Sequence, residues 1–177
     1  MKLVSGNLWS PTCSTDGRFV FYVNTEQPQK IWRIPVEGGT PAEIADILGS
    51  QMTSGLSVSP NGGFLAYGYT KYGHVSSSGW NLCVIHAVGG TPVKTFDFSG
   101  GSWGLRWSPN GKGLQYLLNQ NDATNLWEQP LAGGKPKQLT TFTSGQIFDF
   151  NWSADGKQLL ITRGETTSDV VMLSNLH

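Results

Sequence analysis

The side chains that could act as nucleophiles or metal ligands are few and widely spaced. The chain has two cysteines, Cys13 and Cys83, and three histidines, His74, His86 and His177. Zinc sites draw their ligands from closely spaced Cys and His pairs, and none of these residues forms such a pair. The H-E-x-x-H and G-x-x-x-x-G-K-[ST] patterns of metalloproteases and phosphate-binding loops are also absent. We therefore predict a non-enzyme with no metal site and no cofactor.

Four oxygen-bearing side chains recur within one short pattern, Ser-x-[Asp/Asn]-Gly. The pattern places Asp16, Asn61, Asn110 and Asp155 before glycines. A calcium loop needs several closely spaced oxygen ligands, and each of these residues stands alone. Asp-Gly and Asn-Gly readily adopt the positive φ angles of tight hairpin turns, so we interpret the four patterns as hairpin tips.

The tips mark an internal repeat. Their glycines, at positions 17, 62, 111 and 156, lie 45, 49 and 45 residues apart, and a double glycine follows each of the first three. Short apolar runs with a period of two surround each tip, and no window suits an amphipathic helix, so the pattern predicts four antiparallel strands per unit. The predicted units within one domain, 1–177, are 6–46, 54–98, 103–142 and 148–177, and the last takes its third strand from "DVVML".

Units of this kind must stack to bury both faces of each sheet, and radial stacking gives a β-propeller. The stretches "SPNGKGLQYLL" and "NLWEQPLAGGKPKQLT" resemble the blade of TolB-type, WD-repeat-like propellers, whose pattern begins W-S-P-D-G. The resemblance covers nearly the whole chain, although Thr15 and Ala154 replace the proline and Cys13 and Val58 replace the tryptophan. It implies an all-β fold with four blades in this chain.

The C-terminal stretch "FNWSADGKQLLITRGETTSDVVMLSN" is also similar to the end of propellers found in bacterial serine/threonine kinases and winged-helix regulators. The alignment of the repeats gives the cysteines a structural role. Cys13 occupies the position of Trp107 and Trp152, and Cys83 that of Trp32 and Trp127. We therefore expect both thiols to replace apolar core residues.

One loop differs in length from its equivalents in the other repeat units. The connection between the second and third strands of the second unit, "TKYGHVSSSGWN", is longer than its equivalents. In a propeller this loop shares a face with the connections that enter the next blade, so we predict a ligand-binding rim there. Its residues are Tyr72, His74, Trp80, Trp103 and Phe148, with Arg106 and Asp149 as polar members. In the alternative interpretation the aromatics pack between blades and the insertion is merely tolerated.

Three arrangements of the ends remain open. The chain is a segment of a longer propeller, a four-bladed ring closed by Lys2 to Ser5 pairing with the last blade, or half of an eight-bladed ring. The last arrangement is a homodimer joined through open blade edges, because unpaired edges invite association. Four blades is at the low end for propellers.

Charge and composition exclude several partners. Twelve basic and twelve acidic residues give a formal net charge of zero, which argues against nucleic-acid binding. No apolar stretch suits a signal peptide or a membrane span, so we expect a soluble chain of undetermined compartment. We predict a non-catalytic scaffold within a larger bacterial protein that binds a protein or small molecule at one face. The alternative is the non-catalytic propeller of a prolyl-oligopeptidase-type peptidase, or a propeller lyase.

Overall fold

The computed structural model describes residues 2–24, 29–48, 51–70, 80–98, 102–165 and 167, and these residues form only strands, turns and connections. The first sheet contains β1 (Leu8–Cys13), β2 (Phe19–Asn24), β3 (Lys30–Pro35) and β4 (Ala42–Asp46). The second contains β5 (Gln51–Val58), β6 (Phe64–Thr70), β7 (Trp80–His86) and β8 (Lys94–Phe98). The third contains β9 (Ser102–Trp107), β10 (Gly113–Gln120), β11 (Ala123–Pro130) and β12 (Lys137–Gln138). The fourth contains, within the described residues, β13 (Gln146–Trp152) and β14 (Leu159–Gly164).

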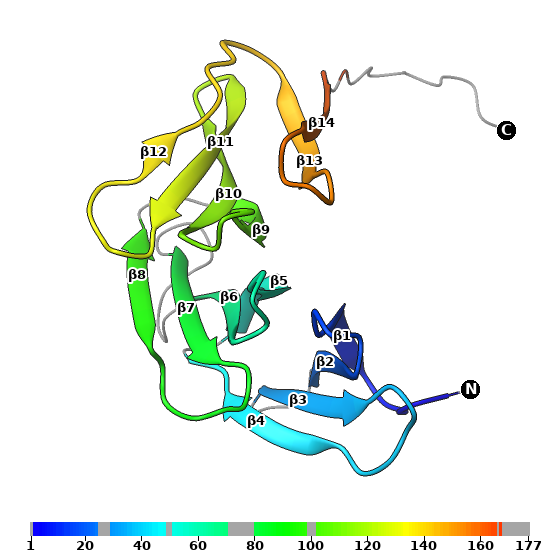
Figure 1. Cartoon of the computed structure of the whole chain (residues 1–177). Coiled ribbons are helices and arrows are strands. Elements are labelled where there is room, and N and C mark those ends of the chain that lie inside the picture. Colours follow the sequence, from blue (N-terminus) through cyan, green and yellow to red (C-terminus); the bar gives the residue numbers. More distant parts are fainter. Residues whose placement is uncertain are drawn as a thin grey trace, which may run out of the picture.

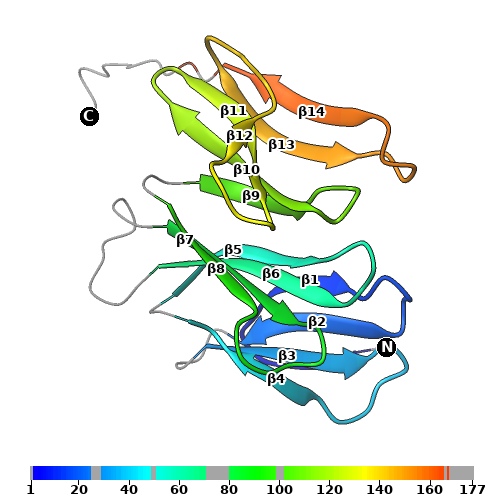
Figure 2. The same cartoon turned by 60° about the vertical axis from the view of Figure 1, so that its left-hand side comes forward.

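The sheets stand side by side as blades along an arc (Figure 1). The first strand of each sheet, β1, β5, β9 or β13, lies on the inner side of the arc, and β4, β8 and β12 lie on its outer side. Figure 2 shows the same blades stacked face to face. Within every sheet, neighbouring strands are antiparallel and consecutive in the chain. The predicted all-β propeller with four blades is confirmed.

Closure of the ring remains a prediction. Residues 2–5, the candidate closing strand, form no strand in the structure. The first and fourth blades lie at the two ends of the arc (Figure 1). The stretch "DVVML", which was to supply the third strand of the last blade, lies outside the described residues. The division into repeat units and the homodimer likewise stay predictions.

The four hairpin tips share one set of hydrogen bonds. In the first tip, the Ser14 hydroxyl donates to Asp16 Oδ1 at 2.6 Å and accepts the N–H of Phe19 at 2.9 Å. The same Oδ1 accepts the N–H of Arg18 at 3.1 Å, and the N–H of Gly17 donates to the Ser14 carbonyl at 2.9 Å. Equivalent bonds close the other three tips, at Ser59, Ser108 and Ser153. The recurring carboxylate and amide oxygens therefore serve the turn.

Two features favour glycine at the tips, namely the backbone φ angle and, in later blades, the closeness of the preceding tip. Its φ angle is between +68° and +70° in all four tips, a range that favours glycine. The glycines of later blades also abut the residue that follows the serine in the preceding tip. A Cβ added to Gly62 would lie 2.4 Å from Thr15 Oγ1, and one added to Gly156 would lie 2.7 Å from Pro109 Cβ. Neighbouring tips therefore touch.

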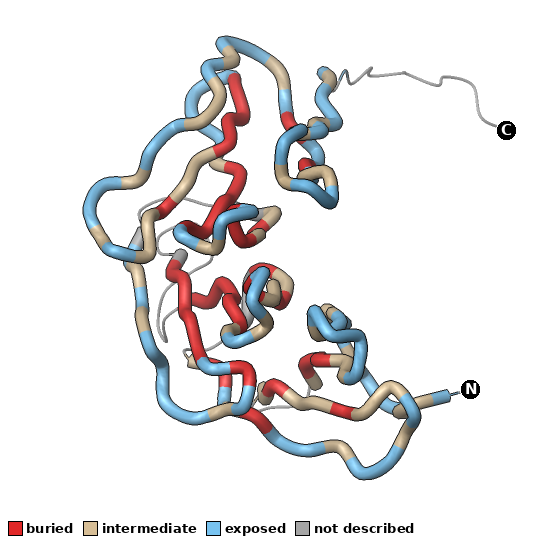
Figure 3. The backbone as a smooth tube through the Cα atoms, viewed as in Figure 1, coloured by how far each residue is buried: buried red, intermediate tan, exposed pale blue. Residues whose placement is uncertain are grey.

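Each interior sheet buries apolar side chains on both faces. Successive residues of a strand point to opposite faces of a sheet. In β6, Leu65 and Tyr67 join the apolar cluster shared with the first blade, whereas Ala66 joins the cluster shared with the third. A further cluster, including Leu117 and Phe150, fills the junction between the third and fourth blades. Buried residues accordingly concentrate in the middle of the arc (Figure 3).

Hydrogen bonds also link the inner strands of neighbouring blades. The N–H of Leu56 in β5 donates to Ser10 Oγ in β1 at 2.7 Å. The indole N–H of Trp107 in β9 donates to the carbonyl of Ser57 in β5 at 3.0 Å. Apolar clusters and polar links therefore act at the same junctions.

The two cysteines differ in their surroundings. Cys83 is fully buried within the core of the first junction, as expected, and burial raises the pKa of its thiol to about 11. The expectation for Cys13 was wrong, because its thiol is exposed. Its repeat position matches that of Trp107, which packs toward the preceding blade. Cys13 belongs to the first blade of this chain, so no described blade covers that face.

Replacing Trp107 by alanine should lower the free energy of unfolding by about 3–5 kcal/mol, because a 6% exposed indole leaves a cavity. Trp9→Ala is the matched control, since this indole is 39% exposed, and it should cost about 1 kcal/mol or less. Urea denaturation of both variants measures the difference. Equal losses would contradict the placement of Trp107 at a junction core.

The native chain should react with Ellman's reagent at Cys13 and not at Cys83, because a buried thiol with a pKa of about 11 has little thiolate at pH 8. Absorbance at 412 nm should report one fast thiol per chain. Cys13→Ser should abolish the fast reaction and Cys83→Ser should preserve it. Fast labelling of the Cys13→Ser protein in its native state would refute the assignment.

Candidate functional site

The two polar members of the predicted rim lie where the third and fourth blades meet. Arg106 in β9 pairs with Asp149 in β13, with Nη2 and Oδ1 2.9 Å apart. Arg106 Nε also donates to the Phe150 carbonyl at 2.7 Å. These contacts join two inner strands, so both charged groups have a structural role. Their side chains nevertheless stay 38% and 61% exposed.

The other rim residues are only partly described. Phe148 is 50% exposed and stands near the start of β13, away from the tip. Trp80 begins β7, opposite Phe98, and Trp103 lies in β9, opposite Leu117. Tyr72 and His74 lie outside the described residues. The gathering of aromatics on one rim therefore stays a prediction.

The face formed by the four hairpin tips carries pockets that the sequence did not reveal; we call it the tip face. Each of the three blade junctions opens a pocket between consecutive tips. The first has a volume of about 260 Å³, the second about 140 Å³ and the third about 280 Å³. Tip residues such as Asp16, Asn61, Asn110 and Asp155 line them. The tip face is therefore indented at regular intervals.

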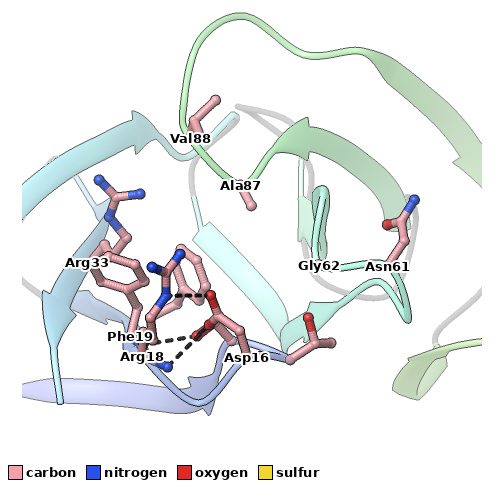
Figure 4. A pocket seen from close by; sticks show the side chains of 11 residues that line it. Asp16, Arg18, Phe19, Arg33, Asn61, Gly62, Ala87 and Val88 are labelled. Carbon is pink, nitrogen blue, oxygen red and sulfur yellow. Dashed lines mark hydrogen bonds and ion pairs between the residues drawn. The ribbon is translucent and has the colours of Figure 1, made fainter.

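The first pocket, between the first and second blades, has the most distinctive chemistry (Figure 4). On one side, the Arg33 guanidinium lies over the ring of Phe19, with Cζ 4.5 Å from the ring centroid. On the other side lie Asn61 and Gly62, and Val88 approaches from the β7–β8 turn. The pocket thus combines a cation, an amide and apolar groups from three hairpins.

Asp16 and Arg18 neutralise one another at the mouth of this pocket. Arg18 Nε lies 2.7 Å from Asp16 Oδ2. The Ser14 hydroxyl, followed by the backbone and side-chain N–H groups of Arg18, holds the pKa of Asp16 at about 2. Asp16 therefore stays ionised at neutral pH. Among the described residues, no carboxylate pairs with Arg33, so its charge is left uncompensated.

Sequence reasoning overlooked Arg33 although a signal was present. Its position in the repeat is held by Val84 in the second blade and Glu128 in the third. Val84 belongs to the core between its own blade, the second, and the third. A guanidinium at the equivalent position of the first blade therefore faces the second blade. A charged residue in a core-facing repeat position was the clue.

Two further findings concern the described residues only. No group of His, Cys, Asp and Glu side chains in the described part is placed to hold a metal ion. No helix found there is long and apolar enough to cross a membrane.

Comparison with known proteins shows the fold. No protein-family model matches the chain, and no curated protein matches it either. TolB from Acinetobacter baumannii superposes with a TM-score of 0.70 at 19% identity, over 94% of this chain and 41% of that chain. An oligogalacturonate lyase from Vibrio parahaemolyticus gives 0.74 at 13% identity, over 92% and 49%. A puromycin-hydrolysing peptidase from Mycobacterium tuberculosis gives 0.66 at 17% identity, over 89% and 28%.

These likenesses confirm the TolB-like β-propeller resemblance at the level of the fold. The chain spans less than half the length of each of the three structures.

Ser14→Ala should raise the pKa of Asp16 from about 2 toward its usual value of 3.8, because the Ser14 hydroxyl is the largest cause of its depression. A depressed carboxyl pKa stabilises the fold above the unfolded-state pKa, and this stabilisation is lost as the pH falls toward 2. Carboxyl carbon NMR titration measures the shift. The matched control is Ser153→Ala, which should raise the pKa of Asp155 and leave Asp16 unchanged. An unshifted Asp16 in Ser14→Ala would contradict the tip geometry.

Proposed function

We propose that this chain is a non-catalytic β-propeller module that binds a segment of a partner protein across its tip face. The observation that carries the proposal is the regular placement of pockets, one at each of the three described junctions between blades. Repeat proteins use surfaces of this kind to hold extended partners, while the stacked sheets act as a scaffold.

Exposed side chains between the pockets support the same face. Val88 is 79% exposed beside the first pocket. Pro60 is also exposed, and it lines both the second and the third pockets. An apolar side chain that is exposed near a pocket contributes contact area to a partner without a large cost of desolvating polar groups.

The relatives supply the second candidate, a propeller that belongs to an enzyme. One structure of similar fold is a peptidase and another is a lyase. Both are less than 20% identical to this chain, so they support a shared scaffold more than a shared reaction. In this candidate the propeller would control the access of substrate to an active site. In a peptidase, the catalytic groups would come from a part of the protein outside the propeller.

Selection of binders from a random peptide library tests which face takes a partner. The strongest peptide selected on the unsubstituted chain is labelled, and its affinity is measured by fluorescence anisotropy. Val88→Arg should weaken binding at least tenfold, because the long charged side chain covers the first pocket. Phe148→Arg is the matched control, since Phe148 is also exposed but lies away from the tips, and it should leave the affinity unchanged.

The opposite pattern would reject the tip face and favour the rim. Loss of binding in Phe148→Arg with an unaffected Val88→Arg is that outcome. Incubation with oligogalacturonate and with chromogenic peptide substrates tests the non-catalytic part of the proposal. Turnover of either substrate by the purified chain would overturn it.

A further inference from the structure

The first pocket has an excess of hydrogen-bond donors. The Arg33 guanidinium lies over the Phe19 ring, with Cζ 4.5 Å from the ring centroid, and its N–H groups have no bonding partner among the described residues. Asn61 uses its Oδ1 to accept the Ser59 hydroxyl at 2.7 Å and the Gly63 N–H at 3.0 Å. Its Nδ2 has no bonding partner among the described residues. A ligand for this pocket must therefore supply acceptors.

The net charge of the pocket favours a ligand whose hydrogen-bond acceptor carries a single negative charge. Arg18 and Asp16 compensate each other, which leaves the single positive charge of Arg33. A carboxylate carries one negative charge and matches the planar guanidinium through two parallel N–H···O bonds. A phosphate dianion would bring a second charge close to Asp16, which is ionised at neutral pH because its pKa is about 2. The electrostatics therefore favour a carboxylate.

The apolar part of the pocket lining indicates which kind of group is attached to the carboxylate. Phe19, Phe21, Ala87 and Val88 surround the charged groups with apolar surface. A volume of about 260 Å³ accommodates one side chain and part of its neighbour rather than a large cofactor. An amino-acid residue with a carboxylate next to an aliphatic group satisfies both requirements.

We propose that the first pocket is a carboxylate-binding site, in which Arg33 holds a peptide carboxylate and Phe19 and Val88 contact its aliphatic neighbour. The carboxylate comes from an Asp or Glu side chain or from a free C-terminus. This assignment rests on the proposed function, because it names the partner chemistry recognised by one pocket of the tip face.

Binding of small carboxylates tests the site directly. Hexanoate, titrated at pH 7 into the ¹⁵N-labelled chain, should shift the backbone amides of Phe19, Arg33 and Ala87 along a saturable curve. The isosteric neutral probe, hexanamide, should bind at least tenfold more weakly. Hexyl phosphate should also bind more weakly than hexanoate. Equal binding of hexanamide, or tighter binding of hexyl phosphate, would overturn the proposal.

Two arginine variants test whether the Arg33 guanidinium binds hexanoate. Arg33→Gln should weaken hexanoate binding at least tenfold. Arg163→Gln is the matched control, because Arg163 also stacks on an aromatic ring, with Cζ 4.3 Å from the centroid of Phe142 in the last described junction. It should leave binding unchanged. Equal effects of the two substitutions would contradict a site at Arg33, and the comparison of probes on the unsubstituted chain holds even where Arg33→Gln unfolds.

Three dipeptides separate the sources of the carboxylate. Acetyl-Leu-Glu-amide tests a side chain, acetyl-Leu-Leu with a free carboxyl tests a C-terminus, and acetyl-Leu-Gln-amide is the neutral control. At least one of the first two should bind tenfold more tightly than the control. If none does, the carboxylate site is refuted, whereas peptides selected from the library can still bind the tip face and leave the proposed function standing.

Discussion

No blade of this chain can bury its own apolar residues, because a single sheet has two faces and no interior. Tyr67 and Ala66 are neighbours in β6, yet they belong to cores on opposite sides of the second blade. Each core therefore exists only where two blades meet. The order of the blades, the inner hydrogen bonds and the pockets all follow from this need for a neighbour.

The same constraint applies to a buried polar side chain at the junction of the third and fourth blades. Gln115 is 2% exposed, and it accepts the indole N–H of Trp152 at 2.7 Å while donating to Glu128 at 2.8 Å. The relay connects the fourth blade to two strands of the third. A buried amide without these partners would cost about 1–3 kcal/mol. This junction thus holds a buried amide where the geometry supplies both a donor and an acceptor.

Local patterns in the sequence were enough to predict the repeat, the tips and the strands. The Ser-x-[Asp/Asn]-Gly tip closes on itself within six residues, so its geometry does not depend on distant parts of the chain. Cys13 shows the limit of such reasoning. Its repeat position predicted burial, but burial requires a preceding blade, and the described chain places none there.

The pocket beside Arg33 shows the same limit for function. Its walls come from the first tip, β2, β3, the second tip and the β7–β8 turn, and they include residues more than 70 positions apart in the chain. Sequence analysis directed attention to the long insertion, where an irregular loop and aromatic residues drew notice. The tip face carried its chemistry in a regular repeat position instead, with an arginine where the next blade has valine.

The contact between neighbouring tips involves the residue that follows each serine. A Cβ added to the glycine of the next tip would meet Thr15 at the first junction and Pro109 at the third, so both residues lie against that tip. A bulkier side chain at this position would increase the separation of the two tips. A surface turn therefore contributes, together with the apolar core, to the spacing of neighbouring blades at the tip face.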